Sequence, residues 1–165
     1  MRRRLGIRSR APRAANPIVR NVMQANRSSG SRIELLMYRA LENAGISFRM
    51  NTVADSRVKC KVDFVLDDSA VCVFVDGCFW HGCPTHFRVP KTNRMWWSEK
   101  VEDNRRRDRR KVVALRRYGW SVVRVWEHEI TDATLHRAVA RILRCVQRKR
   151  MKTPDSIARI RRAEL

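Results

Sequence analysis

Apolar residues recur every three or four positions over residues 31–44, which is the spacing of one face of an α-helix. Ser31 is suited to cap such a helix, and Glu34, three residues later, completes a capping-box pattern. Gly45 follows as a C-terminal stop. The pattern predicts a helix over Ser31–Ala44 with the apolar face Ile33, Leu36, Met37, Ala40, Leu41 and Ala44.

Four segments have the alternation or composition of β-strands. Val58–Leu66 and Ala70–Val75 are separated only by the turn-forming residues 67–69, so we expect them to form a hairpin. The other two predicted strands are Phe48–Val53 and the β-branched segment Trp120–Trp126. A loop over Gly77–Pro90 follows the hairpin.

Further helical patterns complete the predicted order of elements. Trp96–Tyr118 is long, heavily charged and ended by Gly119, whereas Thr131–Val146 is amphipathic. A weaker helical pattern covers Pro17–Asn26. From Ser31 onward the order is helix, three strands, helix, strand, helix. This order predicts an α/β fold in which helices flank a mixed central sheet.

The length of 165 residues suits a single domain with one core. We expect the ordered domain to span residues 18–147. The segment 1–17 is rich in Arg, Ala and Pro, and we expect a basic arm that is disordered when free. Residues 148–165 form a second basic segment, the C-terminal tail.

The chain carries 37 Lys and Arg against 16 Asp and Glu, a net charge of +21. So large a charge indicates a polyanionic partner, because each phosphate that is neutralised releases counterions. A ribosomal or membrane-surface protein is the simpler alternative. Ribosomal proteins this basic are usually poor in Trp, whereas this chain has five, three of them close together (Trp80, Trp96 and Trp97).

No apolar run approaches the length needed to span a bilayer, and the basic N-terminus lacks the apolar core of a secretory signal. We therefore expect a cytosolic protein that does not bind membranes. In that compartment its five cysteines are expected to be thiols or metal ligands rather than disulfides. Cys60, Cys72 and Cys145 lie within predicted strands or a helix, where we expect them to pack in the core.

The loop sequence GCFWHGCPTH, Gly77–His86, has the spacing Cys78-x4-Cys83-x2-His86. His128, just after the last predicted strand, could supply a fourth ligand. Two thiolates and two imidazoles are a common tetrahedral ligand set for structural zinc. In the alternative interpretation, Cys78 and Cys83 are small buried residues and His86 lies on the surface.

Acidic residues stand at two points of the predicted hairpin. Asp63 interrupts an apolar strand and Asp76 ends the next one, so the hairpin could bring both to one divalent cation. Glu34 lies beside the apolar face of the first helix, where capping alone would also explain it. Carboxylates near a basic surface are typical of a magnesium-dependent phosphodiesterase. A buried charge such as Asp63 is costly without a partner or a metal.

His81, between the two loop cysteines, has three open interpretations: a metal-site residue, a catalytic base or an ordinary loop residue. Beside Asp63 and Asp76 it would be suited to move protons, because imidazole titrates near neutral pH.

Aromatic and basic residues follow the loop. Phe79 and Trp80 stand in it, and Trp96-Trp97 open the charged helix. Rings on a basic surface can wedge between base steps, although we expect one of Trp96 and Trp97 to be core. The basic run 104–111, which includes Arg107, is expected to meet phosphates rather than only solvent. Asn104 and Asp108 share one helix face and could orient neighbouring groups.

Several of these motifs together resemble the very-short-patch repair (Vsr) DNA mismatch endonucleases. The motifs are VDFVL, GCFWHGCPTH, VPKTNRMWW, NRRRDRR and YGWSVVRVWE, in this order, and the resemblance covers about residues 20–145. It implies a restriction-endonuclease-like core, with 18–147 as the nuclease domain that carries the zinc loop. It also implies an enzyme that nicks one strand 5′ to the thymine of a T:G mismatch arising from 5-methylcytosine deamination, by magnesium-activated water.

The resemblance also implies roles for individual residues. Asp63 and the carbonyl of Val75 would bind Mg²⁺, His81 would activate water, and Glu34 would support the site through solvent. Zn²⁺ would be structural. The implied zinc ligands are Cys78, Cys83, His86 and His128. The implied DNA contacts are Phe79, Trp80 and Trp97 in an aromatic wedge, Arg107 on the basic helix, and Met23 from the minor-groove side.

Two positions depart from the family pattern. Val62 replaces the proline that precedes the aspartate in the wider nuclease pattern, and Asp76 stands where the best-known members have histidine. Asp76 is therefore either a metal ligand or a residue that orients His81. The implied partner is mismatched double-stranded DNA, bound by a monomer in the bacterial cytoplasm near the nucleoid, with contact to mismatch-repair proteins as a further expectation.

Two rival functions remain open from the sequence. One is a restriction-type endonuclease that cuts both strands, and the other is a zinc-stabilised DNA-binding protein without activity.

Overall fold

The computed structural model describes residues 32–152. The Ser31 cap, the helical pattern over Pro17–Asn26 and Met23 lie outside these residues. The same is true of the arm 1–17 and of the tail beyond residue 152. The division into arm, nuclease domain and tail therefore stays a prediction.

The predicted order of elements is confirmed. A helix over residues 32–43 comes first and ends at Gly45, whose φ of +67° is the left-handed conformation of a helix stop. Four strands form the sheet: β1 (Arg49–Val53), β2 (Lys61–Leu66), β3 (Val71–Asp76) and β4 (Ser121–Trp126). The later helices are α2 (Arg94–Arg117) and α3 (Leu135–Lys152), and short 3₁₀ turns cover Asp67–Ser69 and Glu127–Glu129.

The sheet is mixed, as predicted, with the order β1-β2-β3-β4. β1, β2 and β3 pair antiparallel, and the turn Asp67–Ser69 closes the β2–β3 hairpin. β4 returns after α2 and pairs with β3 in parallel, with Val75 opposite Val125 and Asp76 opposite Trp126. The ends of β3 and β4 therefore lie together, and the chain segments that follow them meet at one edge of the sheet.

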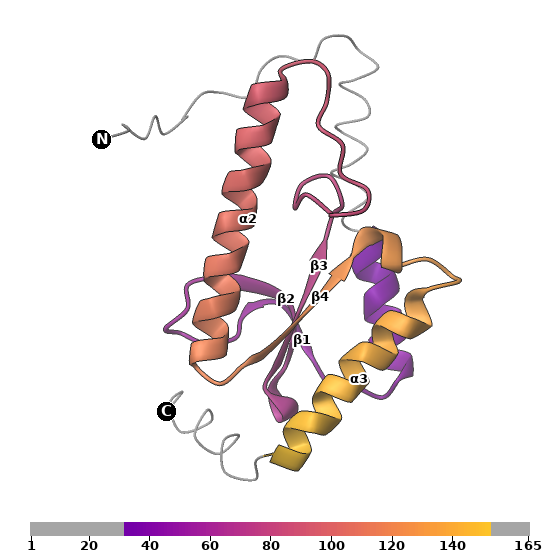
Figure 1. The fold of residues 1–165 in the computed structure, drawn as a ribbon. Helices are drawn as coiled ribbons and strands as arrows, with labels where there is room; N and C mark the ends of the chain where they lie inside the picture. The colour runs from indigo at the N-terminus through magenta and orange to yellow at the C-terminus, as the bar shows by residue number, and fades with distance from the viewer. Residues whose placement is uncertain (1–31, 153–165) are drawn as a thin grey trace.

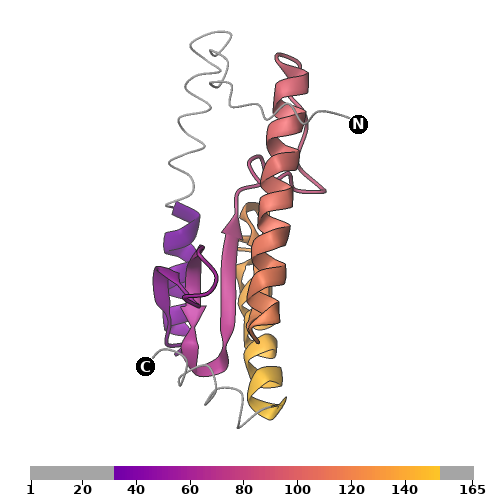
Figure 2. The same cartoon turned by 90° about the vertical axis from the view of Figure 1, so that its left-hand side faces the viewer.

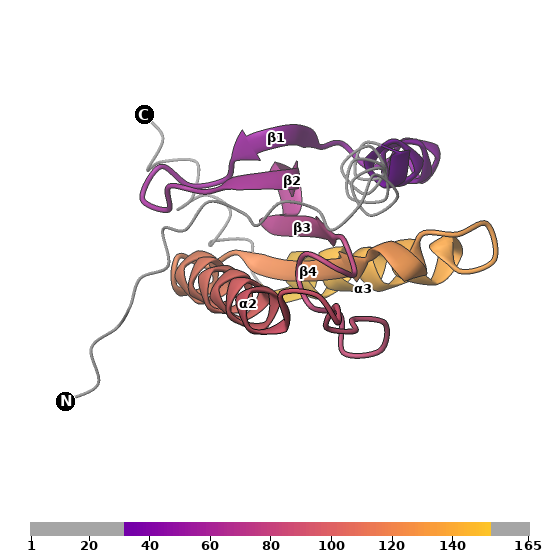
Figure 3. The same ribbon diagram turned by 90° about the horizontal axis from the view of Figure 1, so that it is seen from above.

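Helices cover both faces of the sheet (Figure 1). On one face, the 32–43 helix and α3, the latter through Ile142, pack on sheet residues such as Phe64 and Val73. On the other face, α2 packs through Leu115 beside Cys72 and Trp120. Figure 2 shows β3 between α2 and the 32–43 helix. Figure 3, the view from above, shows α2 and α3 as separate helices. The result is a three-layer α/β/α sandwich.

Four predicted boundaries are wrong by two residues or more. The second strand begins at Lys61 rather than Val58, because residues 54–60 form a turn in which the Asp55 side chain accepts the backbone N–H of Arg57. The charged helix begins two residues earlier than predicted, at Arg94. The last helix begins at Leu135 rather than Thr131 and continues to Lys152, so residues 148–152 of the predicted tail are helical.

The remaining core predictions hold for most residues. Cys60, Cys72 and Trp120 are buried, and Cys145 packs against the α3 side of the core. Trp126 is only half-buried, with the Arg124 guanidinium 5.6 Å from its ring centroid. All five cysteines are free thiols. Within residues 32–152, none of the helices has both the length and the apolar character needed to cross a bilayer.

Candidate active site and metal centre

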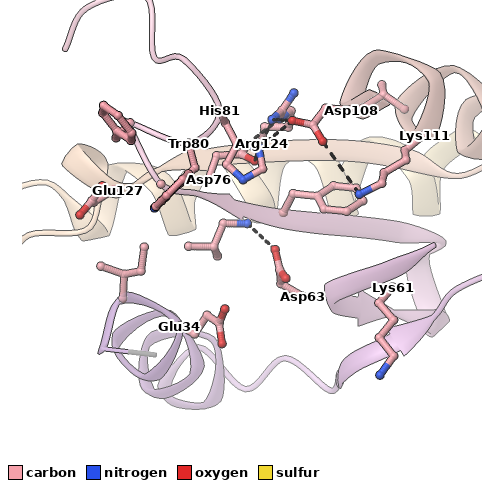
Figure 4. A pocket seen from close by; sticks show the side chains of 16 residues that line it. Glu34, Lys61, Asp63, Asp76, Trp80, His81, Asp108, Lys111, Arg124 and Glu127 are labelled. Carbon is pink, nitrogen blue, oxygen red and sulfur yellow. Dashed lines mark hydrogen bonds and ion pairs between the residues drawn. The ribbon is translucent and has the colours of Figure 1, made fainter. Parts of the chain in front are cut away.

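A cleft of about 380 Å³ opens where β3 ends, between the 32–43 helix and α2 (Figure 4). Five parts of the fold supply its walls: the 32–43 helix, β2, the end of β3 with the following loop, α2 and β4. The cleft brings together the predicted site residues Glu34, Asp63, Val75, Asp76 and His81. Phe79 and Trp80 form one side of its mouth.

Asp63 enters the cleft from the middle of β2. One of its carboxylate oxygens, Oδ2, accepts the backbone N–H of Val75 on the adjoining strand at 2.7 Å. The pKa of Asp63 is raised to about 6. Burial is the largest cause and the nearby carboxylates of Glu34 and Asp76 add to it, whereas the hydrogen bond from the Val75 N–H opposes the shift. A site that disfavours a negative charge in this way would gain from a cation, which is the chemistry expected of a metal-binding aspartate.

Glu34 faces the same cleft from the first helix (Figure 4). Burial raises its pKa above the ordinary value. Its predicted capping partner, Ser31, lies outside the described residues. The position of Glu34 thus agrees with a supporting role near Asp63.

Asp76 is 3% exposed and is held by an arginine from the next strand. Arg124 on β4 donates through both Nε and Nη2 to the two carboxylate oxygens, with Nη2 2.7 Å from Oδ1. Oδ1 of Asp76 also lies 3.4 Å from Nδ1 of His81. These contacts place Asp76 beside His81, and Asp76, His81 and Asp108 also form a group of donor atoms that could hold a metal ion.

His81 is fixed through one ring nitrogen. Its Nδ1 lies 2.6 Å from Oδ2 of Asp108 on α2, and Arg124 Nη2 donates to the same oxygen at 3.1 Å. Burial would raise the pKa of Asp108, but the hydrogen bond with His81 and the charge of Arg124 lower it below its ordinary value. Burial likewise would lower the pKa of Arg124, but its bonds to Asp76 and Asp108 raise it. An ionised Asp108 can hold the Nδ1 proton and leave Nε2 as the basic nitrogen.

The four predicted zinc ligands come together beside this cleft. Their donor atoms, from Cys78, Cys83, His86 and His128, all lie within 4.8 Å of one another. Nδ1 of His128 is 3.2 Å from Sγ of Cys78 and 3.6 Å from Sγ of Cys83, which in turn is 3.6 Å from Nδ1 of His86. Ligands of tetrahedral zinc with ordinary bond lengths are separated by about 3.5 Å, so the set fits this metal.

The loop that carries these ligands is also tied to its surroundings by hydrogen bonds. Glu127 accepts the backbone N–H of Cys78 at 2.9 Å, and Asn104 on α2 donates to the carbonyl of Trp80 at 2.9 Å. Gly82 has a φ of +64°, and a Cβ there would lie 2.5 Å from Cγ1 of Val101 and from Nε of Arg105. The loop can approach α2 this closely only because residue 82 is glycine.

Aromatic rings cluster between the loop and the start of α2. The Phe79 ring lies 5.3 Å from Trp80 and 5.0 Å from Trp97, centroid to centroid, and Trp96 lies 4.7 Å from Trp97. Trp97 is buried at 5% exposure, which confirms that one member of the Trp pair is core. Phe79 and Trp80 are half-buried and present the accessible part of the cluster.

Arg107, the predicted phosphate contact, is exposed on α2 and donates to Oδ1 of Asn104 at 3.4 Å. The prediction that Asn104 and Asp108 orient neighbouring groups is confirmed, since they bind the Trp80 carbonyl and His81.

Sequence reasoning did not identify Arg124, Lys111 and Glu127 as site residues. Arg124 interrupts an apolar strand as Asp63 does, so the same signal was available for it. Lys111, 3.9 Å from Asp108, and Glu127 carried no distinguishing signal, since one lies in a basic run and the other in a turn.

Known proteins are similar to this chain over most of its length. The family model DNA mismatch endonuclease Vsr matches residues 16–86. The type II nicking enzyme V.NaeI of Lentzea aerocolonigenes is 46% identical over 109 residues, which are 65% of this chain and 66% of that protein. The type II nicking enzyme V.XorIIP of Xanthomonas oryzae pv. oryzae is 37% identical over 68% of this chain and 82% of its own length.

A third relative, the DNA mismatch endonuclease Vsr of Escherichia coli (strain K12), is 35% identical over 120 residues, covering 68% of this chain and 75% of that protein. The range of the family model includes the cleft residues Asp63, Asp76 and His81 and three of the four candidate zinc ligands, Cys78, Cys83 and His86. The mixed sheet between helices agrees with the restriction-endonuclease-like fold expected from the resemblance. This chain therefore belongs to the DNA mismatch endonuclease Vsr family.

Proposed function

We propose that this protein is a metal-dependent DNA endonuclease that nicks one strand of a duplex 5′ to the thymine of a T:G mismatch. The convergence of Asp63, Asp76, His81 and Asp108 on one cleft, beside a loop with a zinc ligand set, carries the proposal. The names of the relatives, nicking enzymes and a DNA mismatch endonuclease, support cutting of one strand at a mismatch. The net charge of +21 supports DNA as the partner.

A magnesium ion would be held by Asp63 and the carbonyl of Val75. The donors are hard oxygens, and the carboxylates of Glu34, Asp63 and Asp76 raise the negative potential of the cleft, so the residues fit this cation. When bound, the ion would polarise the scissile phosphate and lower the pKa of a water molecule.

His81 is the proposed general base. Asp108 accepts a hydrogen bond from the protonated Nδ1 of His81. The unprotonated Nε2 is then left to take a proton from the water that attacks phosphorus. Asp76 and Arg124 hold this arrangement from the sheet, at 3.4 Å from His81 and 3.1 Å from Asp108. In this scheme Asp76 is a positioning residue and not a ligand of the metal.

Zinc, bound by Cys78, Cys83, His86 and His128, would fix the loop. Phe79 and Trp80 would then enter the base stack as a wedge, with Trp97 packed behind them. Separating base pairs costs least at a mismatch, which gives the wedge a physical source of selectivity. We further propose that the protein acts as a monomer on DNA in the bacterial cytoplasm.

The test uses closed circular plasmid that either carries a single T:G mismatch or is fully matched. With Mg²⁺, the mismatched plasmid should become a nicked circle and the matched plasmid should stay closed. Linearisation of matched plasmid would favour the restriction-type alternative. Failure to cut either plasmid, with Asp63→Asn binding DNA as the natural chain does, would favour a DNA-binding protein without activity.

A further inference from the structure

The two sides of α2 have different chemistry. Its buried residues, which include Asp108 and Leu115, face the cleft and the sheet. Arg106, Arg110 and Arg117 recur at the spacing of one helix face, and all three are exposed. The helix is on the order of 10 Å wide, so these arginines are separated from the cleft by the body of α2.

These arginines line a groove that a second chain segment completes. The groove has a volume of about 570 Å³, and Val113, Ala114 and Tyr118 line it together with the arginines. Arg57, from the turn between β1 and β2, forms the opposite wall. Since two segments distant in sequence build the groove, it is more than the solvated side of a charged helix.

Arg57 is held rigidly in this wall. Its guanidinium lies 4.1 Å from the centroid of the Tyr118 ring and makes two hydrogen bonds to Asp55, with Nη2 2.6 Å from Oδ2. Asp55 is itself 5% exposed and accepts a hydrogen bond from the Trp120 indole at 3.3 Å. A fixed guanidinium loses little further freedom on binding a phosphate, so it suits a preformed anion site.

The groove has a surplus of positive charge. Arg57 is paired with Asp55, Arg106 with Asp103 and Arg109 with Glu102. Arg110 and Arg117 form no ion pair with another residue of the described range 32–152. Like charges crowded in this way repel, and a polyanion would relieve the repulsion.

From this geometry we infer that the groove on the outer side of α2 is a second binding site for DNA, which takes the backbone phosphates of duplex that is not being cut. The inference rests on the proposed function, because it takes DNA as the substrate. The bound phosphates belong either to the flanking part of the same duplex or to a second duplex. In both cases the site would hold the enzyme on DNA between cutting events.

The test compares the double variant Arg110→Gln/Arg117→Gln with the control Arg144→Gln/Arg148→Gln, which removes the same charge from exposed positions on α3. Equilibrium binding to matched duplex is measured over a range of salt concentrations, without magnesium. One duplex just fills the cut site and the other is several times longer. Thermal unfolding of each variant checks that the fold is kept.

The groove variant should bind the long duplex roughly tenfold more weakly, and the slope of log affinity against log salt should fall by about 1.8 for two lost phosphate contacts. The control should keep the salt slope of the natural protein. The binding of one short duplex to the cut site should be equally tight for the natural protein and both variants. If the natural protein binds two short duplexes at once, the groove takes a separate duplex. If it binds only one, and only the affinity for the long duplex falls in the groove variant, the groove takes the flanking part of the same duplex.

Equal losses in both variants would show a general effect of charge and would overturn the inference. If the groove variant lost as much affinity for the short duplex as for the long one, these arginines would contact the DNA at the cut site. That result would also overturn the inference. Because the assay measures no cutting, it remains informative even if the protein fails to nick T:G plasmid.

Discussion

Asp63 is a carboxylate whose charged form the folded protein disfavours. Its pKa is about 6 in the folded chain, against an ordinary value of 3.8. The folded state therefore binds more protons than the unfolded state between these two values. The stabilisation that Asp63 gives the folded state by binding a proton is fully present below pH 3.8. It is lost as the pH rises through 6. At neutral pH, the ionised carboxylate of Asp63 is therefore a cost to the stability of the fold.

Asp63→Asn should consequently stabilise the metal-free protein while abolishing nicking. We expect the free energy of unfolding at pH 7.5 to rise by about 2 kcal/mol, because the buried charge is removed, and the gain to disappear in acid. Chemical denaturation at several pH values measures the effect, with Glu99→Gln on the exposed side of α2 as the control. A less stable Asn variant at neutral pH would contradict this description of the site.

The folded protein favours the charge of Arg124, whereas it disfavours the charge of Asp63. Arg124 forms ion pairs with both Asp76 and Asp108. Removing one partner of a buried ion pair leaves an uncompensated charge, which typically costs several kcal/mol. In this cleft the two remaining carboxylates would repel each other across the Nδ1 side of His81.

Arg124→Gln should therefore reduce the single-turnover nicking rate at least tenfold with little change in affinity for DNA. The double variant Asp76→Asn/Arg124→Gln should recover part of the rate, because it removes the charge that Arg124 neutralises. If the two losses simply add, or if Arg124→Gln mainly weakens DNA binding, Arg124 contacts the substrate instead of positioning the base.

At the scale of elements, the loop Gly77–Pro90 depends on partners from two other segments, the turn Glu127–Glu129 and α2. His128 follows β4, Glu127 accepts a loop N–H, and Asn104 and Arg105 on α2 donate to loop carbonyls. Burial raises the pKa of the Cys78 thiol to about 11, so the free thiol keeps its proton at neutral pH. A bound dication favours the thiolate and would couple the loop to the fold.

Cys83→Ser should lose zinc, lower the melting temperature and expose the loop to proteases, because it removes a buried ligand. Zinc content measured by mass spectrometry and the sites of limited proteolysis check these outcomes. Cys145→Ser, a cysteine away from the set, should keep the metal. A Cys83→Ser protein with full zinc content would refute the proposed ligand set.

The order of elements could be predicted from the sequence because periodicity and glycine stops are local signals. The start of β2 could not, since Val58 continues the apolar pattern while a side-chain hydrogen bond from the Arg57 backbone to Asp55 holds the chain in a turn. The candidate zinc ligands could be predicted from their spacing, and Asp63 could be predicted because it places a charge in an apolar strand. Arg124 offered the same local signal as Asp63, a charge within an apolar strand, but its partners Asp76 and Asp108 depend on how separate segments meet. The Glu127 contact depends on the same and had no local signal.

At the scale of the whole molecule, the two sides of α2 carry different charges. Asp108 and Lys111, one acidic and one basic, lie on its inner side and line the candidate active-site cleft. The arginines on its outer side, with Arg57, form a groove with no link to the chemistry. The steep dependence of DNA binding on salt that we expect from a charge of +21 should thus have contributions from both sides.

The wedge and the cleft together predict where the cut falls. Phe79 and Trp80 stand at the mouth of the same cleft that holds Asp63 and His81, so the separated base step and the scissile phosphate should be neighbours. Under the proposed function, selectivity and cutting position would therefore have one structural origin.

The most direct test is single-turnover cutting, with Mg²⁺, of a duplex labelled on both strands that contains either T:G or T:A at one position. One cut is predicted, in the thymine strand, at the phosphate 5′ to the mismatched thymine, with the T:A duplex left intact. Equal cutting of the two duplexes, or cuts in both strands, would contradict the proposed function.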